Sequence, residues 1–402
     1  MRTLTIVFLS LLLSTAVFGQ SNKAVKLDGV DNYLPIGMGM LIDKWTVEAW
    51  IKGDGNKWND LEAIIAGGYY AKQNTSDELA LVIKNGRLHN NGAKISSPTI
   101  LPTDKWLHVA AMSDGKNTSL YINGDKVATR DTSITIIPGA IGANDVKESL
   151  FGGMIDEVRI WKTALSTAEL KDWMNQSITP AHPKFSQLHG HYTFDDFSSD
   201  MSINRVAKGH LPYHVRNDRI DYYGERPLAS LVENDNTNFT TYTSDQALFT
   251  ATVIASEWDS DLGARDEQIL KLRIIVDGES NPLSVDKITL DLSKCSDLKD
   301  ISKLNLYYTG TVPRSQVKEA LCKPITKIKK KLTVKLKKSI KLSTGVNYFL
   351  LAADIAPSAK PGNRIKITVP TLSLSKNKIT PIPDESSLDK FISRILKLIK
   401  TF

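Results

Sequence analysis

Residues 151–170 read FGGMIDEVRIWKTALSTAEL, and their first half has the pattern of a strand. Over residues 154–161 the pattern places the even-numbered side chains on one face and the odd-numbered side chains on the other. Asp156 and Glu157 would then point to opposite faces. Two adjacent carboxylates in the middle of a strand need a physical reason.

The second half of the same stretch has the pattern of a helix start. Ser166 and Glu169 have the spacing of a capping box, in which each side chain bonds the backbone N–H of the other residue. Leu165 and Leu170 have the spacing of a hydrophobic staple. The sequence therefore predicts a well-capped helix directly after the strand.

The residues before this stretch predict further short strands. Asn85-Gly86, Asp114-Gly115 and Asn123-Gly124 each lie between strand-like runs. Such dipeptides favour tight hairpins because the preferred turn needs a positive φ at both central residues. Regularly spaced short strands predict a β-sandwich or jelly roll over residues 22–212, with the helix covering one end of it.

Strand-like runs return after a polar interval. Residues 213–245 contain little to bury and are interpreted as a linker. Runs such as ILKLRIIV (269–276) then predict a second β-sandwich over residues 246–383. The fold class is all-β with two domains, which suits a chain of 402 residues.

Both ends of the chain have their own character. Residues 1–19 have the cationic start and apolar run of a secretory signal peptide, and no later stretch reaches transmembrane length. We therefore expect an exported protein, periplasmic, at the cell surface or extracellular, with no transmembrane segment after cleavage. Residues 384–402 predict a short basic amphipathic helix that docks on the second domain, frays, or touches an anionic surface.

Cysteine content and charge bear on the disulfide state and on the expected partners. Cys295 and Cys322 are the two cysteines, and their spacing leaves both a disulfide and two free thiols open. Residues 321–402 hold 18 Lys and Arg against 4 Asp and Glu. In 332–342 the lysines alternate with apolar residues, as on the exposed face of a strand, and no aromatic residues lie among them. Nucleic acid is therefore not an expected partner.

Several blocks of the first unit occur in an order that resembles a known family. The blocks are AVKLDGVDNYLPIG (24–37), WTVEAWIKGD (45–54), KWLHVAAMSDGKNTSLYINGDKVA (105–128), FGGMIDEVRIWKTALSTAEL (151–170) and LHGHYTFDDFSSDMSINRVAKGH (188–210). Together they resemble the laminin-G-like, concanavalin A-type jelly roll. The resemblance implies a fold more directly than a ligand.

Blocks of the second unit resemble another module. LRIIVDGESNPLSVDKITLDL (272–292), DISKLNLYYTGT (300–311) and STGVNYFLLAADIAPSAKPGNRI (343–365) are similar to the N-terminal β-sandwich of Bacteroidetes-type sialidases with BNR repeats. In those enzymes this module precedes a catalytic propeller of several hundred residues. Here 19 residues follow the second unit, and SEWDSDLGARD (256–266) lacks the spacing of the repeat. We therefore expect no catalytic residues and an accessory, non-enzymatic role.

The resemblances also suggest site residues. In laminin-G-like domains acidic residues near the positions of Asp28, Asp31 and Asp156 can hold calcium, which would be structural here; alternatively, Asp156 bonds turn amides or pairs with groups beside Arg159. Trp58, Tyr69 and Tyr70 lie in polar or turn settings and are candidates for stacking against a sugar.

The expected partner is a glycan or glycoprotein. An adhesion or protein–protein module without sugar specificity, and a truncated sialidase remnant, are the competing interpretations. The residues leave the oligomeric state open.

Overall fold

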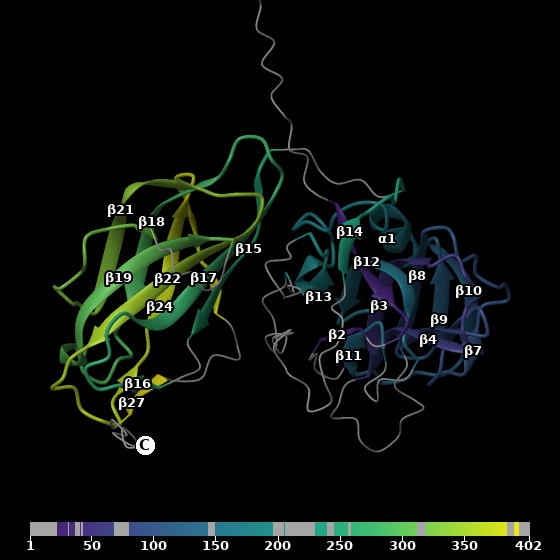
Figure 1. Ribbon diagram of the computed structural model, residues 1–402, viewed down its shortest axis with the longest axis horizontal. Helices are drawn as coiled ribbons and strands as arrows, with labels where there is room; N and C mark the ends of the chain where they lie inside the picture. The colour runs from purple at the N-terminus through teal and green to yellow at the C-terminus, as the bar shows by residue number, and fades with distance from the viewer. Residues whose placement is uncertain are drawn as a thin grey trace, which may run out of the picture.

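The computed structural model describes two β-rich units (Figure 1). The described residues are 22–30, 32–36, 41, 43–67, 80–143, 149–195, 205, 230–238, 245–255, 259–311, 319–383 and 390–393. The predicted signal peptide at 1–19 lies outside them. Within the described part of the chain, no helix has the length and apolar character needed to cross a membrane.

The first unit is a sandwich of two antiparallel sheets. In spatial order the eight-stranded sheet contains β10 (Asp125–Arg130), β9 (Thr118–Ile122), β8 (Leu107–Asp114), β3 (Lys44–Gly53), β12 (Gly152–Trp161), β1 (Lys23–Asp28) and β14 (Ser230–Glu233), with β13 (Leu188–Tyr192) paired to β12. The six-stranded sheet contains β2 (Leu34–Pro35), β11 (Pro138–Ile141), β4 (Leu61–Gly67), β5 (Leu81–Lys84), β6 (Arg87–Asn90) and β7 (Ile95–Ser96). Trp45, Leu81, Val109 and Ile155 are among the buried side chains between the sheets. The predicted all-β sandwich is therefore confirmed.

Strand β14 changes the predicted boundary of the first domain. Ser230–Glu233 pairs antiparallel with β1, so residues 230–236 belong to the first sandwich rather than to the linker expected at 213–245. The pairing uses backbone groups and needs no run of apolar residues, which is why composition did not reveal it. Residues 213–229 and 239–244 lie outside the described residues.

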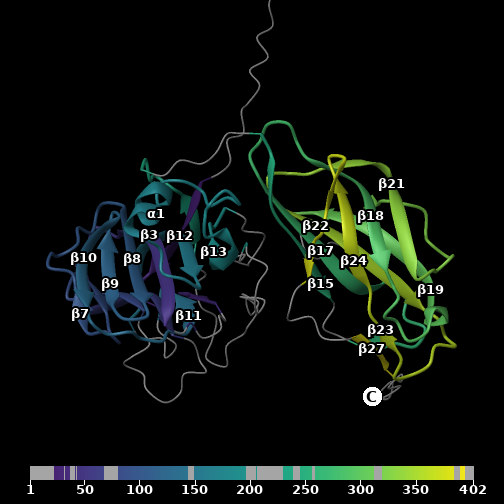
Figure 2. The ribbon, with the colours of Figure 1, turned by 180° about the vertical axis from the view of Figure 1, so that it is seen from behind.

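The second unit is also a sandwich (Figure 2). Its six-stranded sheet contains β20 (Glu319–Ala320), β19 (Ile301–Gly310), β22 (Gly345–Ile355), β17 (Glu267–Asp277), β15 (Ala247–Ala255) and β26 (Ile382–Pro383). Its four-stranded sheet contains β21 (Lys331–Lys341), β18 (Ser284–Asp291), β24 (Thr368–Leu374) and β25 (Asn377–Ile379). A small sheet contains β16 (Ser260–Asp261), β27 (Lys390–Ser393) and β23 (Arg364–Ile365).

The predicted C-terminal helix is wrong where the structure describes the tail. Lys390–Ser393 forms β27, which pairs parallel with β16 and antiparallel with β23. Ile392 is 2% exposed and joins the core of the second sandwich. Pairing with two neighbouring strands thus overrides the helical periodicity, which is only a weak preference. Residues 384–389 and 394–402 lie outside the description.

Both cysteines are free thiols, so the structure selects that alternative over the disulfide. Cys295 and Cys322 are each half-buried, and burial raises the pKa of both thiols. They are therefore protonated at neutral pH and poorly reactive.

Residues of both sandwiches meet in one apolar cluster. Phe249 of β15 is 4% exposed, and its ring centre lies 5.4 Å from that of Phe185 and 5.7 Å from that of His191. The guanidinium of Arg205 lies 4.4 Å from the centre of the same ring and pairs with Asp277 of β17. Figures 1 and 2 both place β13 on the side of the first sandwich that faces β15. The two units are therefore packed against each other rather than merely tethered.

Candidate functional site

Strand β12 is interrupted by a β-bulge at the two adjacent carboxylates. Its pairing with β3 steps from Asp156 directly to Arg159, so two residues of β12 oppose one residue of β3. Glu157 has a φ of 48°, a backbone conformation that side-chain-bearing residues rarely adopt. The bulge corrects the assignment of faces. Val158 and Ile160 lie three and five residues beyond Ile155, so a regular strand would place them on the opposite face, but the extra residue of the bulge returns them to the core face.

The bulge lies where β12 changes its second neighbour. Residues 152–155 of β12 pair with β1, whereas residues 158–161 pair with β13. The two residues between these ladders, Asp156 and Glu157, are paired to neither strand by these registers. Their carboxylates are thus placed where the ends of two other strands approach β12.

Glu157 is the centre of a buried charge network. Its Oε2 accepts hydrogen bonds from Nη2 of Arg159 at 2.9 Å and lies 3.0 Å from Nε2 of His191. Burial alone would raise the pKa of Glu157, but the charge of Arg159 and the contact with His191 outweigh it and lower the pKa to about 2. Glu157 is therefore an anion matched by a fully buried guanidinium.

A second group of polar side chains adjoins it on the same face. Glu48 lies 2.9 Å from Nε2 of His108 and accepts a hydrogen bond from Nε1 of Trp161 at 2.8 Å. Burial would raise the pKa of Glu48, but the hydrogen bond with His108 and the charge of Arg159 lower it. These carboxylates are satisfied by protein groups and do not face a cleft.

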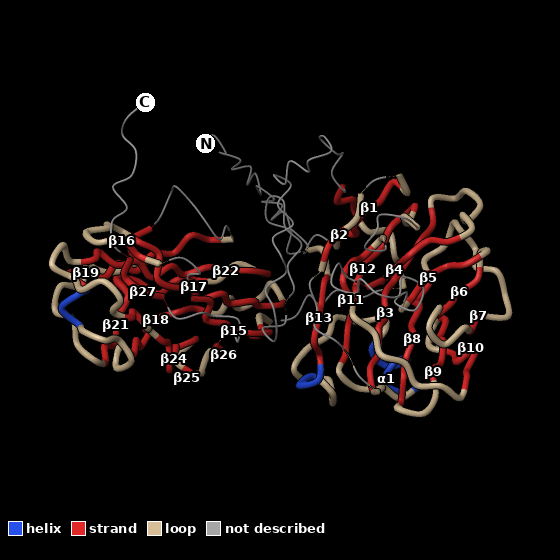
Figure 3. The backbone as a smooth tube through the Cα atoms, turned by 90° about the horizontal axis from the view of Figure 1, so that it is seen from below, coloured by secondary structure: helices blue, strands red, loops and turns tan. Residues whose placement is uncertain are grey.

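The capped helix α1 (Thr167–Trp173) covers this face. Its predicted capping box is confirmed, with Ser166 accepting from the N–H of Glu169 at 3.1 Å and Glu169 accepting from the N–H of Ser166 at 2.7 Å. Arg159 donates to the carbonyl of Trp173 at 2.9 Å, and Trp50 donates to that of Met174 at 2.7 Å. The helix therefore lies over the outer face of the eight-stranded sheet, beside β3 and β8 in Figure 3, and not over an end of the sandwich as expected.

Two of the predicted calcium ligands, Asp28 and Asp156, lie apart along the β1–β12 ladder. Asp28 opposes Gly152 in the β1–β12 ladder, so Asp156 lies four residues further along β12, about 13 Å away at ~3.3 Å per residue. Asp28 accepts hydrogen bonds from the N–H of Val30 and Asn32 in a local turn. Asp31 lies outside the described residues. In the part of the chain that is described, no group of three or more His, Cys, Asp or Glu could hold a metal ion.

Asp156 has protein partners instead. It accepts hydrogen bonds from the N–H of Glu157 and from the amide of Asn234, which follows β14. Burial raises its pKa well above the usual range, and the charges of Glu157 and Asp195 add to this shift. Asp156 therefore bonds one backbone amide of the bulge and one side-chain amide.

Of the predicted stacking residues, the structure describes Trp58, and its ring is buried. Trp58 is 8% exposed, donates to the carbonyl of Leu101 at 2.9 Å, and packs with its ring centre 5.9 Å from that of Phe151. This burial leaves no free ring face of Trp58 for a sugar. Tyr69 and Tyr70 lie outside the described residues.

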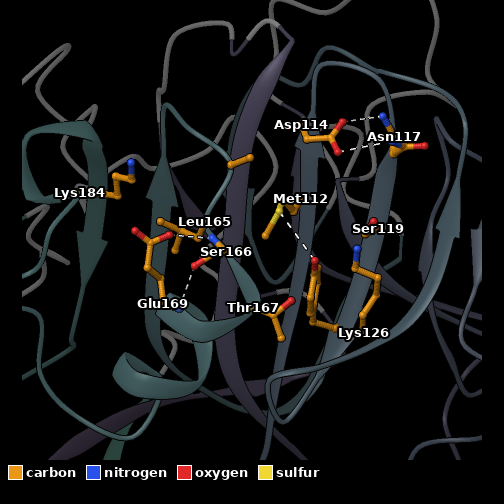
Figure 4. A pocket seen from close by; sticks show the side chains of 12 residues that line it. Met112, Asp114, Asn117, Ser119, Lys126, Leu165, Ser166, Thr167, Glu169 and Lys184 are labelled. Carbon is orange, nitrogen blue, oxygen red and sulfur yellow. Dashed lines mark hydrogen bonds between the residues drawn. The ribbon is translucent and has the colours of Figure 1, made fainter.

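A pocket with a volume of about 540 Å³ lies between α1 and strands β8 to β10 (Figure 4). Its lining comes from the outer face of the sheet, the β12–α1 connection and the residue before η1 (Phe185–Gln187). The lining residues are Met112, Asp114, Asn117, Ser119, Tyr121, Lys126, Ala164, Leu165, Ser166, Thr167, Glu169 and Lys184. The sequence did not predict this pocket because only the fold brings the strands and the helix cap together. The capping box is the one part of the pocket that the sequence indicated.

The two acidic groups of the pocket are already engaged. Asp114 accepts hydrogen bonds from the N–H groups of Lys116 at 2.8 Å and Asn117 at 2.7 Å. Both bonds lower the pKa of Asp114, and the bond from Asn117 lowers it most. Glu169 belongs to the capping box. The ammonium of Lys126 lies 5.8 Å from the centre of the Tyr121 ring. The pocket thus offers hydroxyl, amide and ammonium groups to a ligand.

Comparisons with protein families match both sandwiches. Residues 28–171 match the family model of the concanavalin A-like lectin/glucanases superfamily, and residues 249–378 match that of the N-terminal domain of BNR-repeat neuraminidase. The first sandwich is therefore concanavalin A-like, and the second is similar to the N-terminal domain of these neuraminidases. Both resemblances predicted from the sequence are confirmed.

Solved structures show similar but distant folds, and no curated protein matches the chain. A Bacteroides ovatus protein described as carbohydrate-binding is 22% identical over 46% of this chain and 55% of its own, with a TM-score of 0.36. The Hadza microbial sialidase Hz136 is 15% identical over 35% of this chain and 31% of its own, with a TM-score of 0.29. The CBM40 of a Ruminococcus gnavus sialidase is 17% identical over 37% of this chain and 95% of its own, with a TM-score of 0.32. The chain thus spans about half of the first protein and under a third of the second.

Proposed function

We propose that this chain is an exported, non-catalytic accessory protein that binds a glycan or glycoprotein through the pocket between α1 and the outer face of β8 to β10. The observation that carries the proposal is the chemistry of the pocket lining. Ser119, Thr167, Asn117 and Lys126 line it. The hydroxyl of Ser119 also lies 2.9 Å from that of Thr129, and the amide of Asn117 donates to Asp114 at 3.4 Å. Such a set of convergent hydrogen-bonding groups in a concave site is suited to a hydroxyl-rich ligand.

The positions of the carboxylates support a binding role rather than hydrolysis. Glycoside hydrolysis generally uses two carboxyl groups that flank the scissile bond, one of them held protonated. Glu48 and Glu157 are buried beneath α1 with their pKa values lowered and their oxygens bonded. Asp114, at the pocket, also has a lowered pKa and so is unsuited to be the acid. Asp114 and Glu169 both line the pocket, but each carboxylate accepts hydrogen bonds from backbone N–H groups of its own turn or helix cap.

Two further parts of the proposal rest on sequence. Export is supported by the signal-peptide pattern of residues 1–19. An accessory role is supported by the match of residues 249–378 to the N-terminal domain of BNR-repeat neuraminidase.

The proposal is tested with the purified chain 20–402 on a glycan array, with and without calcium, beside a fluorogenic sialoside assay. We expect selective glycan binding without sialoside turnover. The same binding in both buffers would agree with the separation of Asp28 from Asp156, whereas calcium dependence would direct attention to the loop that contains Asp31. Turnover of the sialoside would overturn the non-catalytic role.

The pocket is tested with the double variant Asn117→Ala/Lys126→Ala. Lys57→Ala/Asn59→Ala removes the same two residue types from an exposed loop outside the pocket and serves as the matched control. We expect the pocket variant alone to lose at least about tenfold in affinity, since each lost hydrogen bond to a ligand is worth ~1 kcal/mol or more. Absence of binding to all sugars would favour the adhesion module instead.

A further inference from the structure

A row of lysines crosses the four-stranded sheet of the second sandwich. Lys335 of β21 opposes Lys287 of β18, Lys287 opposes Ser373 of β24, and Ser373 opposes Lys378 of β25. Residues that oppose one another in paired strands project from the same face of a sheet. Three lysines and one serine therefore lie side by side across four strands.

This row is on the outer face of the sheet. The neighbours of these residues along each strand, such as Val334, Ile288 and Leu372, are buried in the core of the sandwich. Lys335, Lys287 and Lys378 are exposed. Figure 2 shows β21, β18 and β24 turned toward the viewer on the second sandwich.

The next row on the same face consists of hydroxyl groups. Thr333, Thr289 and Thr371 oppose one another on β21, β18 and β24. The hydroxyls of Thr289 and Thr333 lie 3.4 Å apart. The face therefore places hydrogen-bonding groups directly beside the positive charges.

The charges of the lysine row are not balanced from within the sheet. Among the described residues, none of its three ammonium groups forms a salt bridge. The carboxylates on the same strand, Asp286 and Asp291, bond Ser339 and the N–H of Ser293 respectively. Like charges placed directly opposite each other destabilise a sheet, so Lys335 and Lys287 are a local conflict of the kind that accompanies function.

We propose that this lysine row is a docking surface for an acidic polysaccharide, a chain of sugars that carry carboxylate or sulfate groups. The row extends about 14 Å across three strand spacings of ~4.8 Å, a flat track for an extended polyanion. Charge complementarity would attract the acidic groups, and the threonine row would hydrogen-bond the sugar hydroxyls. This surface is distinct from the pocket of the first sandwich and goes beyond the proposed function.

Two other polyanions fit the same face less well. The four strands contain no Phe, Trp or Tyr on which nucleic acid bases could stack. An anionic membrane is normally held by exposed apolar side chains as well as by charge. The large apolar side chains that the structure shows as exposed are Val30, Ile100 and Ile382, and none lies on these strands.

The test uses polygalacturonate as the probe, with neutral dextran as the uncharged comparison. The variant Lys287→Gln/Lys335→Gln/Lys378→Gln removes the row, and Lys57→Gln/Lys84→Gln/Lys105→Gln removes three exposed lysines of the first sandwich as a control of equal net charge. We expect the row variant to lose at least tenfold in affinity for polygalacturonate at low salt, and the control to lose less than threefold. Salt should weaken binding of the unmodified chain more steeply than that of the row variant.

Three results would overturn the proposal. Equal losses in both variants would show a general effect of net charge. No binding of the unmodified chain to polygalacturonate, or equal binding to dextran, would exclude an acidic polysaccharide as the ligand of this surface. Tighter binding to phosphatidylserine vesicles or to a single-stranded oligonucleotide than to polygalacturonate would assign the surface to another partner. The lysine row is outside the pocket. Glycan binding by the Asn117→Ala/Lys126→Ala variant therefore tests the proposed function of the pocket independently of the lysine row.

Discussion

The outer face of the eight-stranded sheet and that of the four-stranded sheet both carry charged side chains, but they use them in opposite ways. On the first face, Arg159, Glu157 and Glu48 are buried beneath α1, and opposite charges are in contact. On the second face, Lys335 and Lys287 are exposed and carry like charges side by side. A charge within a strand therefore predicts neither exposure nor binding until the covering element and the register are known.

The largest expected effect comes from breaking the buried network. Arg159→Met leaves the carboxylate of Glu157 buried without its cation, and we expect a loss of about 3–5 kcal/mol in the free energy of unfolding. Urea unfolding of the full chain measures it. Lys335→Met, the same type of change on the exposed face, should stay within about 0.5 kcal/mol. Similar losses in the two variants would contradict the contrast between the faces.

The next effect concerns the contact between the sandwiches. Phe249→Ala removes a ring that packs against Phe185 and His191 as well as its own sheet, and we expect a loss of about 3 kcal/mol. We also expect one calorimetric transition in the unmodified chain to separate into two. Phe349→Ala, inside the second sandwich, should cost as much without separating the transitions. An unchanged transition in the Phe249 variant would mean that the cluster does not couple the units.

Acid should lower the free energy of unfolding through His182, which lies on the face that α1 covers. Burial lowers the pKa of His182, which packs 4.5 Å from the Trp161 ring, to about 4. Between about pH 4 and 6.5 the unfolded chain therefore holds this proton more tightly than the folded chain, so stability falls as the pH falls. From pH 7 to 5 the loss from this group should be about 1–2 kcal/mol.

His182→Asn isolates that effect. Nδ1 of His182 accepts from the N–H of Lys184 at 3.0 Å, and an asparagine oxygen can replace this acceptor without titrating in this range. Thermal unfolding at pH 7 and pH 5 should show a smaller difference for the variant than for the unmodified chain. An identical difference would mean that another group causes the acid sensitivity.

The smallest effect has the opposite sign. Lys287→Gln relieves the like-charge pair with Lys335 on the exposed face, and we expect a gain of about 0.5 kcal/mol at low salt that fades at high salt. Lys105→Gln, an exposed lysine outside any strand pair, should be neutral. A loss of stability in Lys287→Gln would show that the row stabilises the sheet by itself, contrary to the docking proposal.

Local patterns predicted the elements that depend on local physics. The hairpin dipeptides, the capping box at Ser166 and both sandwiches follow from residues close together in the chain. The bulge at Glu157 and the strand β27 did not follow from them. Each depends on which strands are neighbours, and a one-residue step or a paired edge cancels a simple periodicity.

The surroundings of Trp58, Asp28 and Asp156 could not be predicted for a related reason. Trp58 lies in a polar stretch, yet its ring is covered by Phe151 from a distant part of the chain. Asp28 and Asp156 lie on paired strands, but Asp28 opposes Gly152, four residues before Asp156. The pocket required β8, β9 and the cap of α1 to converge, and its residues are individually ordinary. Composition and spacing cannot give such convergence.

The central claim, that the chain binds a glycan through the pocket beside α1, is tested most directly by titration calorimetry. The chain 20–402, the variant Asn117→Ala/Lys126→Ala and the control Lys57→Ala/Asn59→Ala are titrated with the strongest glycan from the array. We predict saturable binding by the chain and the control, and at least tenfold weaker binding by the pocket variant. Equal affinity in all three proteins, or no glycan that binds the chain, would contradict the claim.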